Sequence, residues 1–235
     1  MLDKKLTDLK KSVYFANIKL FKENLIIFTF GNVSGMDRER EIIAIKPSGV
    51  DYNKLTQDDI VLVDLDGKII DGALKPSSDT KTHLRLYKEF SEIGVIAHTH
   101  SKFATIFAQA KLPLKCLGTT HADYFYGDIP CSKVITDKAV KKDYEEETGS
   151  LIIDTFRDNN LNYKDIRACL VASHGPFTWG DNADEAVYMS VVLEEIARLN
   201  FFTQLLNPSI KSIKRTLLDK HYQRKHGKDA YYGQR

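Results

Sequence analysis

Short β-rich runs separated by turn signals are the feature that most constrains what this chain can fold into. Four such runs, LIIFTF, EIIAI, DIVLVD and KII, fall between residues 25 and 70, and Asp66-Gly67 separates the last two. An Asp-Gly pair between two apolar runs is a strong signal for a tight β-hairpin, whose strands are antiparallel. The first third of the chain is therefore predicted to be mostly antiparallel strand.

Helical patterns surround these runs and continue along the chain. Apolar residues recur every three or four positions over residues 4–21, which places them on one face of a helix. Later predicted helices follow KPSSD and cover 102–110, 137–159 and 183–206, and later predicted strands are GVIAHTH (94–100) and ACLVASH (168–174). No repeat or linker-like segment divides the sequence, so we expect residues 1–235 to form a single α/β domain, a mixed sheet with helices on both faces.

The composition narrows the classes of partner. The formal net charge is +2 from 34 basic and 32 acidic side chains, too balanced to indicate a nucleic acid partner. No apolar run approaches the roughly 20 residues needed to span a bilayer. The three cysteines are an odd number without paired spacing, which suggests neither a disulfide framework nor a CxxC metal site. We therefore expect a cytoplasmic protein that binds neither nucleic acid nor membrane.

The predicted strand GVIAHTH ends in two histidines, His98 and His100. Side chains two residues apart on a strand point to the same face, so the two imidazoles would project side by side. A divalent metal bound to both neutral rings would use their lone pairs and remove the repulsion between protonated neighbours. Two hydrogen-bonded histidines at a strand end are the alternative, and the spacing alone does not separate the two interpretations.

A third histidine strengthens the metal interpretation. The predicted strand ACLVASH ends in His174, which is followed by a Gly-Pro turn. Three histidines with an open fourth position are typical of a catalytic zinc, whereas a structural zinc site more often uses cysteines. His121 in GTTHADYFYG competes with His174 for the third place, and the spacing does not decide between them.

Other polar residues suit chemistry beside such a metal. Asp79 and Asp123 are candidate acid/base groups, although Asp79 would equally cap a helix and Asp123 would equally occupy a turn. The segments FGNVSG, KPSG and KPSSD combine glycine, serine or asparagine with a nearby lysine, which suits contacts to a phosphate. The tyrosine pair Tyr231 and Tyr232, near the C-terminus, is better explained by contact with another element or a neighbouring subunit than by a solvated end.

Eight segments along the chain closely resemble one family. In order they are GNVSGMDRE, IKPSGVDY, KPSSDTKTHLRLY, HTHS, GTTHADYFYGDIPC, SHGPFTWG, VLEEIA and LLDKHYQRKHGKDAYYGQ. They resemble the class II aldolase and adducin family, and within it the epimerases that act on L-ribulose 5-phosphate. The resemblance implies a three-layer α/β/α domain with a central, largely antiparallel sheet. It also implies a cyclic homotetramer with active sites between adjacent subunits.

The same resemblance implies a ligand set. One zinc ion per subunit, or manganese in its place, is expected on His98, His100 and His174, with Asp79 close to the metal. His121 then lies outside the ligand set. Residues that match the family's substrate and phosphate contacts are Gly31, Asn32, Lys46, Ser48, Gly49, Ser77 and Ser78, and further matches near the site are Thr119, Glu145 and His221.

The resemblance also implies the catalytic groups and the reaction. Asp123 and Tyr232 match an acid/base pair on opposite sides of the substrate, with the tyrosine arriving from the neighbouring subunit. The reaction is expected to break and re-form the bond between carbons 3 and 4 of the sugar phosphate, with the metal stabilising the enediolate of the dihydroxyacetone fragment. Rotation of the glycolaldehyde phosphate fragment in between would yield D-xylulose 5-phosphate.

Two related activities are the alternatives. Sugar-phosphate aldolases of the family carry a glutamate as general base where this chain has Asp79, which favours the epimerase. The adducin-like branch acts as an interaction module and lacks the metal histidines, which this chain retains. Epimerases of L-arabinose and of L-ascorbate catabolism share all these motifs, so the pathway stays open.

Overall fold

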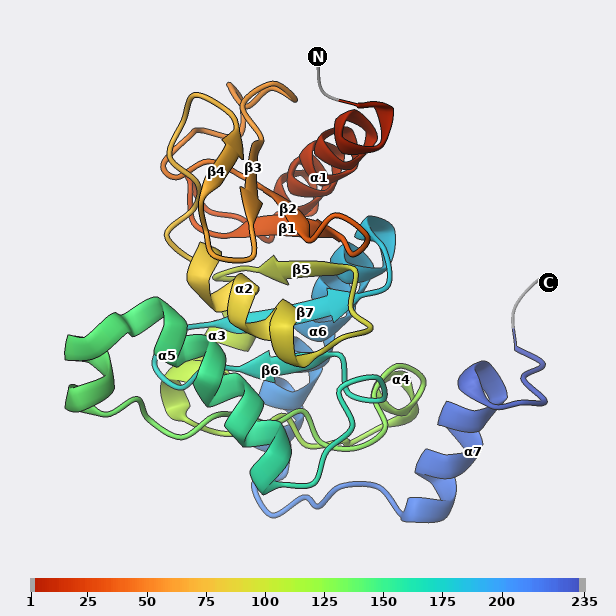
Figure 1. The fold of residues 1–235 in the computed structure, drawn as a ribbon. Helices are drawn as coiled ribbons and strands as arrows, with labels where there is room; N and C mark the ends of the chain where they lie inside the picture. The colour runs from red at the N-terminus through yellow and green to blue at the C-terminus, as the bar shows by residue number, and fades with distance from the viewer. Residues whose placement is uncertain (1–2, 233–235) are drawn as a thin grey trace.

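A seven-stranded sheet forms the centre of the structure, a computed structural model that describes residues 3–232 (Figure 1). The strands are β1 (Asn32–Asp37), β2 (Ile42–Ile45), β3 (Val61–Asp64), β4 (Ile69–Asp71), β5 (Val95–His98), β6 (Ala168–Leu170) and β7 (Pro176–Gly180). Their order across the sheet is β4-β3-β2-β1-β5-β7-β6, and every neighbouring pair is antiparallel. The predicted α/β class with a largely antiparallel sheet is confirmed, while the parallel pairs of a mixed sheet do not occur among these strands.

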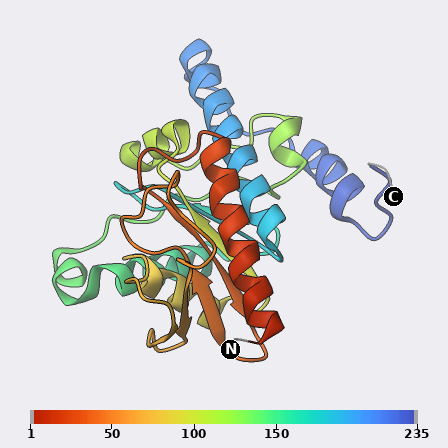
Figure 2. The ribbon, with the colours of Figure 1, turned by 90° about the horizontal axis from the view of Figure 1, so that it is seen from above.

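Helices cover both faces of the sheet. They are α1 (Lys4–Lys22), α2 (Thr80–Glu89), α3 (Lys102–Ala110), α4 (Thr119–Ala122), α5 (Asp137–Asp158), α6 (Ala183–Leu206) and α7 (Arg215–His226). Helices α1 and α6 pack side by side on one face, and α2 packs against α5 on the other (Figures 1 and 2). These layers are the ones expected of an α/β/α domain. Within residues 3–232, no helix is long and apolar enough to cross a membrane.

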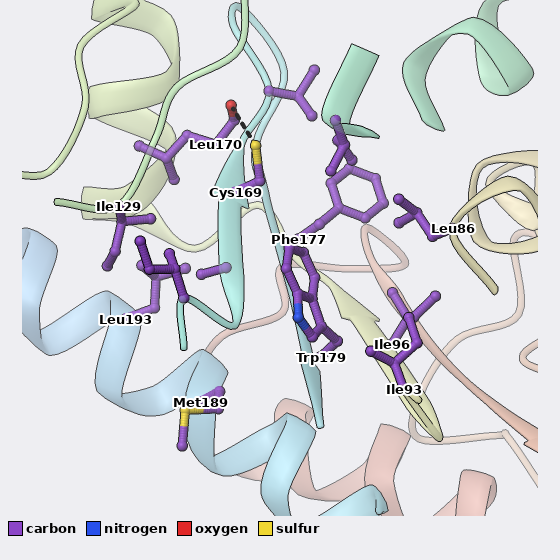
Figure 3. Close-up of a cluster of buried hydrophobic side chains, with 14 of the residues drawn as sticks. Leu86, Ile93, Ile96, Ile129, Cys169, Leu170, Phe177, Trp179, Met189 and Leu193 are labelled. Carbon is purple, nitrogen blue, oxygen red and sulfur yellow. Dashed lines mark hydrogen bonds between the residues drawn. The ribbon is translucent and has the colours of Figure 1, made fainter. Parts of the chain in front are cut away.

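Alternate residues of the central strands supply the two halves of the core. Val95 and Ala97 of β5 pack toward α1 and α6. Ile96 of β5 packs on the opposite face together with Phe177 and Trp179 of β7, in the cluster that also takes in α2 and α5 (Figure 3). Because successive side chains of a strand point to opposite faces, β5 anchors both helix layers. The strand that ends in His98 is therefore one of the most firmly held elements of the fold.

Several elements differ from the sequence predictions, and β6 covers only Ala168–Leu170 of the predicted strand 168–174. The run LIIFTF is irregular, and β1 begins only after it, at Asn32. Within that run Phe28 has a φ of 54° and is 77% exposed, so it does not belong to the sheet. Strand β7 starts at Pro176, where a turn was expected, because a proline is tolerated at the first position of a strand. Helix α7 occupies a tail whose pattern predicts no helix, whereas the Asp66-Gly67 hairpin between β3 and β4 is confirmed.

Candidate active site

Three histidines converge beyond the end of β5. One side-chain nitrogen from each of His98, His100 and His174 lies within 4.8 Å of the others. His98 is the last residue of β5, His100 follows outside the strand, and His174 lies in the turn between β6 and β7. The Nε2 atoms of His98 and His100 are 3.1 Å apart. His121 lies elsewhere, with its Nε2 2.8 Å from the carbonyl oxygen of Gly127, so the geometry selects His174 as the third member.

Hydrogen bonds fix the outer nitrogens of two of these rings. Nδ1 of His98 lies 3.0 Å from the carbonyl oxygen of Pro176, which can only accept, so Nδ1 carries the proton and a neutral ring keeps its lone pair on Nε2. Nδ1 of His174 lies 3.2 Å from the hydroxyl of Tyr144. Burial and the neighbouring His98 lower the pKa of His100 to about 4 and that of His174 to about 3. Converging neutral imidazoles with their outer nitrogens held in place are a donor set that fits a divalent metal such as zinc.

Asp79 lies beside the histidines at the start of α2. Its side chain makes no capping bond to the helix, and Oδ2 instead accepts a 2.7 Å bond from Nδ2 of Asn32. Burial opposes ionisation of this carboxyl, but His98, His83 and His174 outweigh it and hold the pKa of Asp79 below its usual value. The capping interpretation of Asp79 is therefore wrong for its side chain. Its carboxylate instead lines the same cavity as the three histidines.

A cavity of about 350 Å³ opens beside the three histidines. Its wall contains all seven residues matched to substrate and phosphate contacts, namely Gly31, Asn32, Lys46, Ser48, Gly49, Ser77 and Ser78, together with Asp79 and Glu145. Two of its loops are joined by backbone hydrogen bonds of 3.0 Å, from Ser77 to Lys46 and from Ser48 to Lys75. The chain segments KPSG and KPSSD thus form one continuous rim.

Lys46 gives this cavity a positive charge. Its side chain is fully buried, and its Nζ donates a 3.2 Å bond to the carbonyl oxygen of Pro47. Among the described residues, no carboxylate lies within 4.0 Å of that ammonium group. Burial lowers the pKa of Lys46 to about 8. A buried cation without a carboxylate partner is suited to an anionic ligand such as a phosphate.

Asn32 presents an acceptor to the same cavity. Its Nδ2 donates to Oγ of Ser77 at 3.0 Å and to Asp79, whereas its buried Oδ1 has no hydrogen-bond partner in the described part of the chain. Gly31 precedes it with a φ of +96°, and a Cβ there would lie 2.6 Å from the carbonyl oxygen of His98. Only glycine fits this position. The unpartnered Oδ1 of Asn32 is free to accept a bond from a substrate hydroxyl.

Tyr144 is a site residue that the sequence did not reveal. It lines the cavity and holds Nδ1 of His174, and it follows a break in α5, where Asp143 has a non-helical φ of −165°. The break turns Tyr144 and Glu145 toward the histidines. Its sequence surroundings, KKDYEEE, are typical of a solvated helix, so no pattern there indicated a functional tyrosine.

A second polar cluster lies between α4 and α7. Asp123 accepts bonds of 2.8 and 3.0 Å from Arg224 and one of 3.0 Å from Nδ1 of His221. Burial alone would raise the pKa of Asp123, but the opposing effect of Arg224, His221 and Lys225 is larger, so its pKa lies below the usual value. The Tyr232 ring is covered by Arg224 and Lys225, at 4.5 and 4.7 Å from its centroid. Asp123 and Tyr232 thus share neighbours in one chain.

This cluster is separate from the histidine cavity. Thr119, Asp123, His221 and Tyr232 are absent from the cavity wall, and α4 and α7 lie away from α2 and the start of α5 (Figures 1 and 2). The expected acid/base pair takes Tyr232 from a neighbouring subunit, so its absence from the cavity of its own chain agrees with that expectation. The structure therefore unites the predicted metal and phosphate residues, and it unites the predicted acid/base residues, but it keeps the two groups apart.

Comparison with known proteins agrees with this architecture. The family model of the class II aldolase and adducin N-terminal domain matches residues 11–201. The L-ribulose-5-phosphate 4-epimerases UlaF of Salmonella paratyphi B and of Salmonella paratyphi A are each 47% identical to this chain over 227 residues, which cover 97% of it and 99% of each relative.

Solved structures share the fold at lower identity. An L-fuculose 1-phosphate aldolase superposes with a TM-score of 0.79 and 24% identity, over 94% of this chain and 96% of its own. YgbL from Klebsiella pneumoniae, a putative aldolase/epimerase/decarboxylase, superposes with a TM-score of 0.70 and 23% identity, over 91% of this chain and 97% of its own. With the family model covering most of the sequence and relatives at 47% identity over nearly its full length, the chain belongs to the class II aldolase and adducin family.

Proposed function

We propose that this chain is an L-ribulose-5-phosphate 4-epimerase, which interconverts L-ribulose 5-phosphate and D-xylulose 5-phosphate. The observation that carries the proposal is one cavity that combines three converging histidine nitrogens with a buried lysine that has no carboxylate partner among residues 3–232. A sugar phosphate with its hydroxyl oxygens toward the histidines and its phosphate toward Lys46 would satisfy both ends. The two relatives at 47% identity, both L-ribulose-5-phosphate 4-epimerases, support the same activity.

His98, His100 and His174 are the proposed ligands of one zinc ion per chain, with Asp79 beside it. Imidazole nitrogens suit zinc better than manganese, which prefers oxygen ligands. A divalent cation held by these histidines would supply Lewis-acid stabilisation to negative charge on the substrate oxygens. The bond from Asn32 keeps the Asp79 carboxylate oriented toward that charge.

The proposed reaction is cleavage and re-formation of the bond between carbons 3 and 4. The hydrogen on carbon 4 is not adjacent to the carbonyl and is not acidic, so direct deprotonation is unfavourable. Lys46 and the serines of the rim would hold the phosphate of the glycolaldehyde phosphate fragment while its aldehyde group rotates. Oδ1 of Asn32 would accept a hydroxyl of the other fragment. Two proton-transfer groups are needed for the two faces of the aldehyde, and Asp123 and Tyr232 are the proposed pair.

A homotetramer with active sites between subunits reconciles the two separate clusters. Asp123, Tyr232, Thr119 and His221 would reach the histidine cavity of an adjacent subunit, both acid/base groups arriving from the same neighbour. Large apolar side chains on the surface of α3 and α6 are available for such contacts, namely Ile106, Leu199, Phe202, Leu205 and Leu206. We propose that residues 1–235, of which 3–232 are described, act as one catalytic domain in the cytoplasm, where the three free cysteines would stay reduced.

A class II sugar-phosphate aldolase is the second candidate. The structural likeness to an L-fuculose 1-phosphate aldolase extends to the fold alone, at 24% identity. Both reactions begin with the same bond cleavage, but an aldolase releases the two fragments. The products therefore separate the two activities.

A coupled assay of the purified protein with L-ribulose 5-phosphate tests the proposal. We expect D-xylulose 5-phosphate as the product, about one zinc per chain by elemental analysis, loss of activity on chelation and recovery on adding zinc back. Release of free glycolaldehyde phosphate as the main product would favour the aldolase. Full activity in metal-free protein would end the metal proposal.

A further inference from the structure

Tyr52 lies behind the phosphate end of the cavity and contacts two parts of its wall. It belongs to the segment between β2 and β3, is only 2% exposed, and is not itself part of the wall. Its ring stacks on Phe21 of α1 with a centroid distance of 5.5 Å. None of the chemistry proposed above uses this tyrosine.

The face of the Tyr52 ring is a neighbour of the Lys46 ammonium group. Nζ lies 4.6 Å from the ring centroid, and its hydrogen bond to Pro47 is the only one recorded for it among the described residues. A buried ammonium group is costly unless it is paired, and an aromatic face offers it partial negative charge. A carboxylate in that place would compete with a phosphate for the same cation, whereas a ring does not. The ring thus stabilises the charge of Lys46 and leaves it available.

The hydroxyl of Tyr52 holds the opposite wall. It donates a 2.9 Å bond to the carbonyl oxygen of Gly31. Gly31 has a positive φ and leads directly into Asn32, whose side chain bonds Ser77 and Asp79. Fixing the carbonyl of Gly31 therefore fixes the path of the backbone that carries Asn32 into the cavity.

We propose that Tyr52 is a positioning residue of the phosphate end of the site, whose ring holds Lys46 and whose hydroxyl holds Gly31. The inference rests on the proposed function in that it assigns a substrate phosphate to this end. A tyrosine that merely fills the core would matter only through its size. Two substitutions separate the roles, because Tyr52→Phe keeps the ring and removes the hydroxyl, whereas Tyr52→Leu removes both.

Binding of inorganic phosphate, measured by isothermal titration calorimetry on the zinc-loaded protein, and KM for the sugar phosphate are the readouts. Loss of the hydroxyl leaves the Gly31 carbonyl unsatisfied, so Tyr52→Phe should raise the phosphate Kd and KM by about tenfold while kcat changes by less than about twofold. Tyr52→Leu should raise both constants by at least about thirtyfold, because a desolvated cation also loses its aromatic face.

The pH dependence of KM separates the effect of the Tyr52 ring on Lys46 from the effect of the Tyr52 hydroxyl. Only protonated Lys46 binds the phosphate. Because the pKa of Lys46 is about 8, KM of the wild type should rise as the pH increases above 8. In Tyr52→Leu the rise in KM should begin at a lower pH, and in Tyr52→Phe it should begin at the same pH as in the wild type. Other titratable groups around Lys46 are Asp51 on its own loop, Asp79 and Glu145 on the wall, and the three histidines. All of these are the same in both variants, so a difference between the variants reports the ring.

Tyr87→Phe is the matched control, because Tyr87 is another buried tyrosine whose hydroxyl donates to a backbone carbonyl, that of Ser34 at 3.0 Å. It should lower the thermal midpoint and leave the phosphate Kd and KM unchanged. Wild-type phosphate affinity in Tyr52→Phe would overturn the inference, and so would a rise in KM that begins at the wild-type pH in folded Tyr52→Leu. If Tyr52→Leu does not fold, Tyr52→Phe decides alone. Phosphate binding needs no turnover, so Tyr52-dependent binding in a protein inactive on L-ribulose 5-phosphate would refute the proposed function and leave this inference standing.

Discussion

The histidine cavity and the cluster between α4 and α7 are held by the fold in different ways. The cavity is built on sheet strands and their immediate extensions, and His98 and Lys46 are each only 1% exposed, while His100 and His174 are half-buried. The second cluster rests on the four-residue helix α4 and on α7, which follows an irregular segment after α6. Its Tyr232 is 53% exposed. One group is held by the central sheet, and the other is held mainly by the ion pairs that Asp123, itself only 8% exposed, makes with α7.

This difference in burial and support matches the proposed roles of the two groups. A metal site and a phosphate site require fixed distances, which buried side chains on strands provide. Proton-transfer groups must reach a substrate after it has bound, and a surface helix with an exposed tyrosine can present them to a cavity in another copy of the chain. The following predictions test this division, beginning with the largest expected effect.

His98→Asn should remove the metal and nearly all activity. With one of three ligands lost, we expect zinc content to fall well below one per chain and kcat to fall by at least about 1,000-fold. Elemental analysis and the coupled assay measure the two quantities. His121→Asn is the matched control, since His121 is also buried but lies outside the cavity, and it should retain its zinc. Normal zinc content in His98→Asn would contradict the ligand assignment.

Tyr232→Phe should impair catalysis while leaving the cavity intact. Loss of a proton-transfer group is expected to lower kcat by about 100-fold, with zinc content and KM close to the wild type. Steady-state kinetics on zinc-loaded protein measures this split between kcat and KM. An unchanged kcat in this variant would show that Tyr232 contributes only to packing.

Mixed assemblies of these two inactive variants test whether the halves meet between chains. Co-expression of His98→Asn and Tyr232→Phe chains in equal amounts should restore about a quarter of the wild-type sites, because a site then draws one intact half from each of two subunits. Separately purified variants that are simply combined without exchange are the control. No recovery in co-expressed assemblies would argue that both halves act within one chain.

Lys46→Met should weaken binding more than turnover. Removing the charged partner of the phosphate is expected to raise KM by about 10- to 100-fold. It should also abolish the rise of the wild-type KM above pH 8, since the lysine with a pKa of about 8 is gone. Initial rates between pH 6.5 and about 9.5 test both points. A rise in KM that persists in Lys46→Met would assign the titration to another group.

The same substitution should stabilise the fold. The pKa of Lys46 is depressed in the folded state, so its ammonium group opposes folding at neutral pH, and this penalty disappears as pH rises from about 8 toward 10.5. Lys46→Met should therefore raise the thermal midpoint by a few degrees at pH 7 and by less at pH 10. A lower midpoint at pH 7 would mean that contacts of the lysine outweigh its desolvation.

Asp79→Glu should have the smallest effect on the rate, but it should change the products. The extra methylene moves the carboxylate within a cavity where Asn32 now holds it, so we expect kcat to fall by less than about tenfold and some turnovers to release glycolaldehyde phosphate. Chromatography of the products detects that fragment. A variant that makes only D-xylulose 5-phosphate would show that the length of this side chain does not separate the epimerase from an aldolase.

The sequence predicted the fold class and most elements because periodicity reports burial of a face. It failed at LIIFTF, whose β-branched and aromatic residues suit a strand but which is irregular, with Phe28 at a positive φ and largely exposed. It failed at β1, where Asn32 and Ser34 are polar yet buried, since their hydrogen bonds come from residues distant in the chain. Helix α7 is polar on nearly all sides and buries only Leu218 and Tyr222, so its pattern carried no signal.

The site was predictable where one short segment carried the information. The pair His98 and His100 followed from its spacing, and the glycine- and serine-rich loops suggested a phosphate. The sequence spacing did not decide between His121 and His174, because that choice depends on which turn faces the end of β5. Tyr52 acts through its contacts alone, and nothing in the segment GVDYNK indicates them.

The placement of α7 beyond α6 has a kinetic consequence. Because the proposed acid/base groups and the proposed metal ligands of one chain do not meet, we expect a solitary chain to bind metal and still turn over no substrate. Specific activity should then fall on dilution as subunits separate, and the rate should rise more steeply than linearly with enzyme concentration in that range. A cell that makes little of this protein would obtain disproportionately little flux from it.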